Sequence, residues 1–172
     1  MESSIHPLVQ LAREAIKEYI KTGKFISLPA ELTDEMREKH GVFVSLKMKG
    51  LLRGCIGTYE AATSCVAEEI IHNAISAATH DPRFTQVSLT ELDEINISVD
   101  ILTDSEPVRS IGELDPKRYG VIVKSGYKRG LLLPDIEGVN TTEEQIDIAK
   151  KKAGIGDNEP LEIFKFEVRR YR

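Results

Sequence analysis

Long apolar runs, cysteines and aromatic residues are all scarce in this chain of 172 residues. No apolar stretch approaches the roughly 20 residues that a membrane-spanning helix needs, so we expect no contact with a membrane. Two cysteines are too few for a disulfide framework and indicate thiols in a reducing compartment. The N-terminus shows no basic region followed by an apolar stretch, which is the pattern of a secretory signal peptide. These absences predict a cytoplasmic protein.

Positive charge is also in short supply. The net charge is −5, from 23 Lys and Arg residues against 28 Asp and Glu residues, and aromatic residues make up 6% of the chain. Binding to nucleic acid or to anionic lipid needs a positive field, and single-stranded nucleic acid also needs aromatic platforms. The basic runs at residues 150–152 and 169–172 are interpreted as the solvated faces of a helix and a terminus. We therefore expect no nucleic-acid partner.

The usual signatures of metal and nucleotide sites are missing as well. The chain has no Cys-x-x-Cys pair, and His72 and His80 are too far apart for the helical i, i+4 spacing of zinc ligands. Neither a phosphate-binding glycine loop nor a dinucleotide fingerprint occurs. The sequence predicts no metal site and leaves any cofactor undetermined.

The apolar residues that are present predict an α+β fold with a largely antiparallel β-sheet flanked by helices. Helical spacing is found at residues 8–20, from residue 63 or 64 to 79, and from a capping box at Thr142 to Gly154. Alternating patterns predict strands at residues 42–48, 52–58 and 95–102, a hairpin over 121–133, and a last strand over 161–172. Hairpins interleaved with lone helices are typical of antiparallel α+β proteins. The length predicts one domain over residues 1–172.

The hairpin at residues 41–58 has a predicted register. A three-residue loop at positions 49–51 places Val42, Val44 and Leu46 on one apolar face together with Ile56. A two-residue loop would turn Cys55 onto that same apolar face, which favours the three-residue loop. We therefore expect the hairpin to lie inside the sheet, with Cys55 on the face opposite Val44.

The second strand of this hairpin carries the heptapeptide LRGCIGT at residues 52–58. Side chains alternate along a strand, so Arg53 and Cys55 share a face and the guanidinium can favour the thiolate by lowering the pKa of the thiol. A guanidinium cannot serve as a base, and a cysteine of this kind is most often a small buried hydrophobe. Cys65, at the start of a helix, is interpreted as a capping or packing residue.

At these residues the chain resembles the AMMECR-type domain family, whose signature is the LRGCIGT heptapeptide. Residues 81–84 (DPRF) and 129–134 (RGLLLP) resemble the second and third motifs of that family, in the same order. The resemblance runs from about residue 41 to 155 and implies a compact α+β fold with a cleft lined by the motifs. The chain also resembles protein A of the bacterial and archaeal AmmeMemoRadiSam system, which implies Memo-like and radical-SAM proteins as possible partners in a shared modification pathway.

The resemblance also singles out the candidate site residues. Cys55 and Arg53 are the candidate catalytic residues, and the candidate binding residues are Gly54, Gly57, Thr58, Asp81, Arg83 and Arg129. Arg53, Cys55, Asp81 and Arg83 are expected to converge on one surface. The three arginines suit a carboxylate or phosphate group, which predicts a small anionic ligand. The structural alternative is that Asp81 pairs with Arg83 across a turn and that Arg129 is solvated.

Two hypotheses of function follow from these residues. The first is a small cytoplasmic enzyme that acts on a small anionic substrate through Cys55 and the motif arginines. The alternative is a non-catalytic binding or adaptor module that presents the LRGCIGT face to a protein partner. A concave pocket with Cys55 at its floor supports the enzyme, whereas a flat or convex face supports the module.

Overall fold

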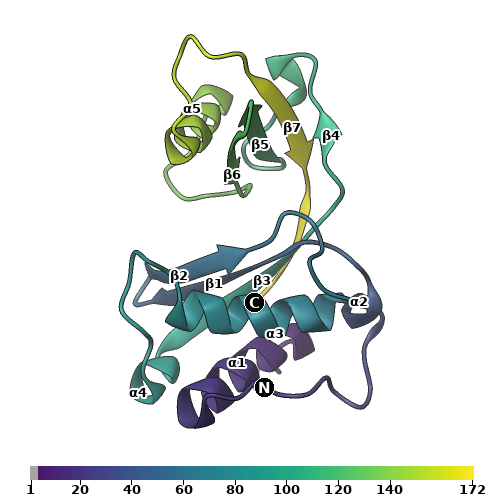
Figure 1. The fold of residues 1–172 in the computed structure, drawn as a ribbon, viewed down its shortest axis with the longest axis vertical. Helices are drawn as coiled ribbons and strands as arrows, with labels where there is room; N and C mark the ends of the chain where they lie inside the picture. The colour runs from purple at the N-terminus through teal and green to yellow at the C-terminus, as the bar shows by residue number, and fades with distance from the viewer. Residues whose placement is uncertain (1–3) are drawn as a thin grey trace. The chain divides into compact units, whose positions relative to one another are not determined.

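Two four-stranded antiparallel sheets and five α-helices make up the fold of residues 4–172, which the computed structural model describes (Figure 1). The chain divides into two compact units. The first holds the residues up to Leu102 together with Arg169–Arg172, and the second holds Thr103–Val168. The α+β class predicted from the sequence is confirmed, and one domain over residues 1–172 stays a prediction.

The ends of the helices in the first unit are set by the residues that flank them. Helix α1 (Pro7–Thr22) starts at a proline, which suits the first turn, and ends at Gly23 with φ 70°. Helix α3 (Val66–Thr79) contacts both α1 and the strands β1 and β2, and it is buried on most of its sides. Its N-cap is Cys65, so the prediction of a cap at residue 63 or 64 was wrong. Two single turns, α2 (Asp34–Arg37) and α4 (Leu89–Leu92), complete the helices of this unit.

The first sheet has the order β2-β1-β3-β8, with strands β2 (Leu51–Gly57), β1 (Val42–Met48), β3 (Ile95–Leu102) and β8 (Val168–Tyr171). Figure 1 shows α1 and α3 on one side of this sheet. Val42, Val44 and Leu46 are fully buried in the core of this unit, whereas Ile56, which we expected to be buried with them, is only half-buried and packs against that core. The prediction that the hairpin lies inside the sheet is correct for β1 and wrong for β2, which is an edge strand.

The β1–β2 hairpin reaches its register in an unexpected way. Its loop has two residues, Lys49 and Gly50, with φ values of 51° and 79°, so the prediction of a three-residue loop was wrong. Two positive φ values give a turn whose twist matches that of the strands. A register shift after Leu46 then leaves Arg53 as the extra residue of a β-bulge. Beyond the bulge Ser45 lies opposite Cys55, so Cys55 is on the predicted face, opposite to that of Val44.

The second unit is a smaller sheet covered by one helix. The sheet has the order β4-β7-β5-β6, with β4 (Glu106–Pro107), β7 (Glu162–Phe166), β5 (Gly120–Ser125) and β6 (Lys128–Leu132). Helix α5 (Thr142–Ala153) packs on β5 and β6, and a 3-10 turn spans Ile111–Glu113. The core of the unit includes Val121, Val123, Leu132, Ile146 and Ala149.

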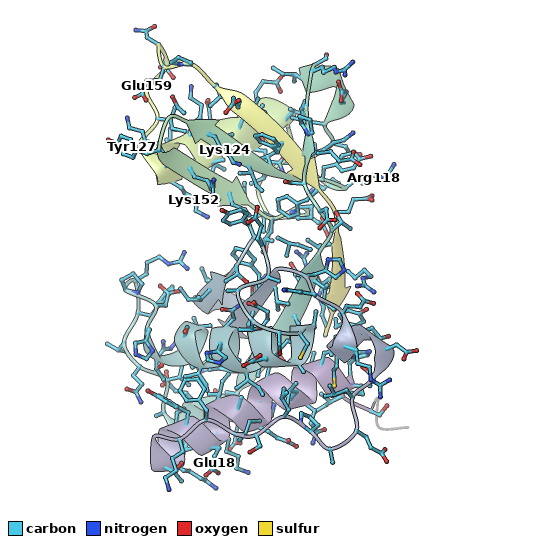
Figure 2. All side chains as sticks on the ribbon, turned by 45° about the vertical axis from the view of Figure 1, so that its right-hand side comes forward. Glu18, Arg118, Lys124, Tyr127, Lys152 and Glu159 are labelled. Carbon is cyan, nitrogen blue, oxygen red and sulfur yellow. The ribbon has the colours of Figure 1, made fainter. Side chains whose placement is uncertain are left out.

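Three details of the second unit refine the sequence predictions. The capping box of α5 is formed by Thr141 and Glu144, one residue earlier than predicted, and Gly154 is the C-cap as expected. The segment at residues 161–172 is not one strand, because β7 and β8 belong to different sheets. The β5–β6 turn carries Tyr127, which is 95% exposed (Figure 2).

Over residues 4–172, no helix combines the length and the apolar character needed to cross a bilayer.

Candidate functional site

The thiol of Cys55 lies on the face of the first sheet that α1 and α3 do not cover. The residue is half-buried, and its Sγ is 3.2 Å from the Oγ of Ser45 on the neighbouring strand. Gly57 occupies the same face two residues later. A Cβ built on Gly57 would lie 2.2 Å from the ring of Phe43, so this glycine leaves the space that the ring fills. The Ser45 hydroxyl is therefore a neighbour of the thiol on β1, and the ring of Phe43 covers Gly57 farther along the same face.

The turn that follows α3 holds the backbone of Cys55 through side chains. The Asp81 carboxylate is buried, and its Oδ2 accepts a hydrogen bond from the backbone N–H of Cys55 at 3.0 Å. The Arg83 guanidinium donates to the carbonyl oxygen of Cys55 at 3.2 Å. Asp81 and Arg83 are joined by two side-chain bonds of 3.0 and 2.8 Å and by the Arg83 N–H at 3.1 Å. The predicted pairing across the turn is present, and both of its members also contact Cys55.

The electrostatics of this turn keep both partners charged. The Arg83 guanidinium, aided by the backbone N–H groups of Cys55 and Arg83, lowers the pKa of Asp81 to about 2, while burial of the carboxyl opposes the shift. The Asp81 carboxylate in turn raises the pKa of Arg83, and Cys55 contributes in the same direction. The ion pair is therefore intact throughout the neutral range of pH.

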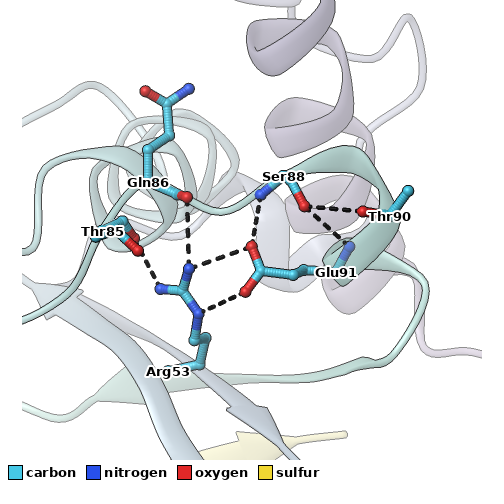
Figure 3. A network of polar contacts seen from close by, with 6 residues as sticks. All are labelled: Arg53, Thr85, Gln86, Ser88, Thr90 and Glu91. Atoms are coloured by element: carbon cyan, nitrogen blue, oxygen red, sulfur yellow. Dashed lines mark hydrogen bonds and ion pairs between the residues drawn. The ribbon is translucent and has the colours of Figure 1, made fainter.

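Arg53 makes a separate network with the segment that leads into α4 (Figure 3). Its Nε and Nη2 donate to the two carboxylate oxygens of Glu91 at 3.0 and 3.2 Å, and its Nη1 donates to the carbonyl of Thr85 at 2.8 Å. Glu91 also accepts from the N–H of Ser88 in the capping box of α4. Arg53, followed by the Ser88 N–H, lowers the pKa of Glu91. Arg53 thus fastens the segment after the Asp81 turn to β2.

Glu91 changes the charge balance that the motifs predict. The prediction of an anionic ligand rested on the positive charge of the three motif arginines, whereas the structure pairs Arg53 with Glu91 and Arg83 with Asp81. The capping box of Ser88 and Glu91 is visible in the sequence. Its contact with Arg53, 38 residues away, has no local signal.

Two further motif residues face α3 rather than Cys55. A Cβ built on Gly54 would lie 2.2 Å from the carbonyl oxygen of Ala77, so the glycine allows α3 to pack directly on the strand. The Thr58 hydroxyl donates to the buried Glu69 carboxylate at 2.8 Å and accepts from Asn73 at 3.3 Å. The sequence reasoning missed Glu69 and Asn73. Their spacing on the same helical stripe as the core residues of α3 could have identified them.

The structure thus brings together most of the predicted site residues. Cys55, Asp81 and Arg83 are in direct contact, and Arg53 holds the segment that follows them. Arg129 is exposed on β6 in the second unit, where it lies opposite Lys124, so its convergence with the other arginines stays a prediction. Over residues 4–172 no group of three or more His, Cys, Asp or Glu residues is placed to hold a metal ion.

Comparison with known proteins places the chain in a family. The sequence model of the AMMECR1 family matches residues 9–171. The chain belongs to the AMMECR1 family. A relative from Thermotoga maritima is 54% identical over 170 residues, which cover 97% of this AMMECR1-family chain and 98% of the relative. The family membership inferred from the three motifs is therefore confirmed.

Two other matches extend the comparison, one to a longer relative and one to a solved structure. A relative from Clostridium acetobutylicum is 54% identical over 168 residues, which are 96% of this chain and 36% of the relative. The chain therefore spans about a third of that longer protein. The crystal structure of the uncharacterized protein PH0010 from Pyrococcus horikoshii has a TM-score of 0.88 and 36% identity, and the match covers 95% of this chain and 88% of that one. The two proteins share the AMMECR1-family fold.

Proposed function

We propose that this AMMECR1-family protein is a small cytoplasmic enzyme that uses Cys55 as a nucleophile on a small anionic substrate. The observation that carries the proposal is the setting of Cys55. Cys55 is half-buried on the face of the first sheet opposite α1 and α3, and its backbone is held by Asp81 and Arg83. A nucleophilic thiol needs a fixed position, some access and a cationic neighbour, and this setting supplies candidates for all three.

Arg83 is the substrate anchor in this proposal. Its side chain is 52% exposed although Nε and Nη2 contact Asp81. A guanidinium engaged along one edge can still bind a carboxylate or phosphate through its remaining donors. Arg53 has a compensating carboxylate in Glu91, so we assign it an indirect role through the segment that it fastens. Arg129 would add positive charge if the three motifs line one cleft, as the family resemblance implies.

The remaining motif residues shape the strand that carries the nucleophile. Gly54 lets α3 approach the strand, Gly57 makes room for the ring of Phe43, and Thr58 ties the end of the strand to Glu69. For the setting of the reaction we propose the shared modification pathway that the resemblance implies, with Memo-like and radical-SAM proteins as partners.

The test is retention of metabolites by the purified protein, read by mass spectrometry. The wild-type protein and the matched control Cys65→Ser should retain the same anionic compound, or carry the same mass adduct. Cys55→Ser should lose the adduct, and Arg83→Gln should weaken retention by about tenfold, the effect of losing one charge-assisted contact. Iodoacetamide should label Cys55 faster than Cys65, which is buried at the N-cap of α3.

Equal adduct formation by Cys55→Ser and wild type would remove the nucleophile from the proposal. Slower labelling of Cys55 than of Cys65 throughout the range of pH 6 to 9, which brackets the usual thiol pKa of about 8.5, would make Cys55 a structural thiol. The alternative, a non-catalytic module that presents this face to a protein partner, would then be the better hypothesis.

A further inference from the structure

We infer that Asp81 and Arg83 are positioning residues that clamp the backbone of Cys55 at the edge of the first sheet and thereby set the reactivity of its thiol. The inference deepens the proposed function and rests on it for the importance of Cys55. It differs from the sequence prediction, which gave Asp81 and Arg83 only a role in binding. We refer to these two side chains as the edge clamp.

The geometry of the strand is the first step. β2 is the edge strand of its sheet, and Cys55 lies opposite Ser45 on β1. In an antiparallel pair, alternate residues direct their backbone N–H and C=O away from the partner strand. On an edge strand those groups have no strand beside them. The hydrogen bonds of Cys55 to Asp81 and Arg83 show that its N–H and C=O point outward in this way.

The edge clamp matches what a neighbouring strand would offer. Asp81 supplies an acceptor to the N–H of Cys55 at 3.0 Å, and Arg83 supplies a donor to its C=O at 3.2 Å. The two side chains are locked to one another, since the carboxylate accepts three bonds from Arg83 as well. Pro82 lies between them in the turn and restricts its backbone. The clamp therefore contacts Cys55 at two points through one rigid unit.

Fixing the backbone also limits where the thiol can go. With N and C=O held, Sγ moves by rotation about one bond, and it lies 3.2 Å from the Ser45 hydroxyl. The clamp also keeps the Arg83 guanidinium on the residue that carries the thiol. Loss of either member should let the strand edge open locally, which separates the thiol from both neighbours.

The test measures the pH midpoint of iodoacetamide labelling at Cys55 in the full-length protein and hydrogen exchange of peptides that contain the Cys55 amide. In Asp81→Asn and Arg83→Gln, the midpoint should move in the same direction, upward, by about one unit. Exchange at the Cys55 amide should be about tenfold faster in both variants. Arg83→Lys should behave like Arg83→Gln, because a single ammonium cannot reproduce the two-edged guanidinium contact.

A simple effect of charge gives a different pattern. Removal of the Asp81 carboxylate would lower the thiol midpoint, removal of the Arg83 charge would raise it, and Arg83→Lys would restore the wild-type value. Opposite shifts, rescue by lysine, or unchanged exchange at Cys55 would each overturn the inference. These readouts need no substrate, so their failure is distinct from equal adduct formation by Cys55→Ser, which would overturn the proposed function.

Asp100→Asn is the matched control. Asp100 is a buried carboxylate of the same unit that makes a two-point ion pair with Arg170, at 2.8 and 2.7 Å. Asp100 lies opposite Phe43 on β1, so its loss removes a buried charge from the same sheet while both side-chain partners of the Cys55 backbone stay in place. If the Cys55 midpoint shifts as much in Asp100→Asn as in Asp81→Asn, the shift is a general effect of lost stability. That result would count against the edge clamp. Unchanged exchange in peptides of β3 shows that the clamp variants remain folded.

Discussion

The β1–β2 and β5–β6 hairpins, one in each unit, pack against a helix in the same way. Each has a two-residue loop, and each places an Arg-Gly pair on the edge strand of its sheet. A Cβ on Gly54 would lie 2.2 Å from the carbonyl oxygen of Ala77 in α3, and a Cβ on Gly130 would lie 2.1 Å from that of Ala149 in α5. In both units a helix therefore rests directly on a glycine of the edge strand.

The arginine before each glycine shows where the two hairpins differ. Arg53 is the extra residue of a β-bulge, its side chain is 11% exposed, and it forms an ion pair with Glu91. Arg129 lies in regular register opposite Lys124 and is exposed. At β6, the side chain of Lys152 donates to the carbonyl of Leu131, whereas at β2 Asp81 and Arg83 hold the backbone of Cys55 and Glu91 pairs with Arg53. The glycines are thus shared architecture, and the polar network at Cys55 is the specialised feature.

The largest effect should come from the shared feature. Gly54→Ala and Gly130→Ala each place a methyl group against a helix carbonyl that cannot move independently, so each should lower the free energy of unfolding by about 3 kcal/mol or more. Urea denaturation with hydrogen exchange read separately for each unit is the measurement. Gly112→Ala, whose Cβ would lie 3.6 Å from its nearest neighbour, is the control and should be nearly neutral. A tolerated alanine at either position would show that the helix can shift.

The next effect should separate the two arginines. Arg53→Met leaves the Glu91 carboxylate and the carbonyl of Thr85 without their donor, which should cost about 1–3 kcal/mol of unfolding free energy. Arg129→Met changes an exposed side chain and should cost less unfolding free energy than Arg53→Met. Chemical denaturation of both variants at neutral pH is the measurement. Equal losses would mean that the specialised network adds nothing to stability.

The smallest effect should appear in the dependence of stability on pH. The pKa of Asp81 is lowered from 3.8 to about 2 by folding, so the folded state binds fewer protons than the unfolded state in this window. Stability from this carboxylate is present above about pH 4 and is lost as the pH falls towards 2. Asp81→Asn should flatten the acid limb of the stability curve by about 1–2 kcal/mol, allowing for the exposure of Arg83.

Glu159 in the second unit sharpens this last comparison. Its pKa is lowered mainly by Lys128, but its side chain is 35% exposed whereas that of Asp81 is buried, so Glu159→Gln should change the acid limb less than Asp81→Asn does. Denaturation at a series of pH values between 2 and 6 provides the test. A larger change in Glu159→Gln would contradict the view that the Asp81 turn is the more tightly built of the two.

Much of the fold was accessible from the sequence because it depends on local periodicity. The alternation of Val42, Val44 and Leu46 correctly predicted the buried face of β1, and the spacing in α1 and α3 correctly predicted both helices. The loop at Lys49 and Gly50 was mispredicted because a bulge at Arg53 restored the same register with one residue fewer in the turn. A bulge has no clear signature in a single sequence, since it depends on the pairing with the partner strand and on the packing of neighbouring elements.

The candidate site divides in the same way. The sequence by itself determined that Cys55 lies opposite the apolar face and that Asp81 and Arg83 can pair, because strand alternation and a proline turn are properties of neighbouring residues. Only the tertiary structure decided that this pair holds the Cys55 backbone, that Glu91 accepts from Arg53, and that Gly54 lies beneath Ala77. These contacts join residues between 23 and 38 positions apart. No local pattern encodes them, because they arise when packing of α3 on the sheet brings the following turn to the strand edge.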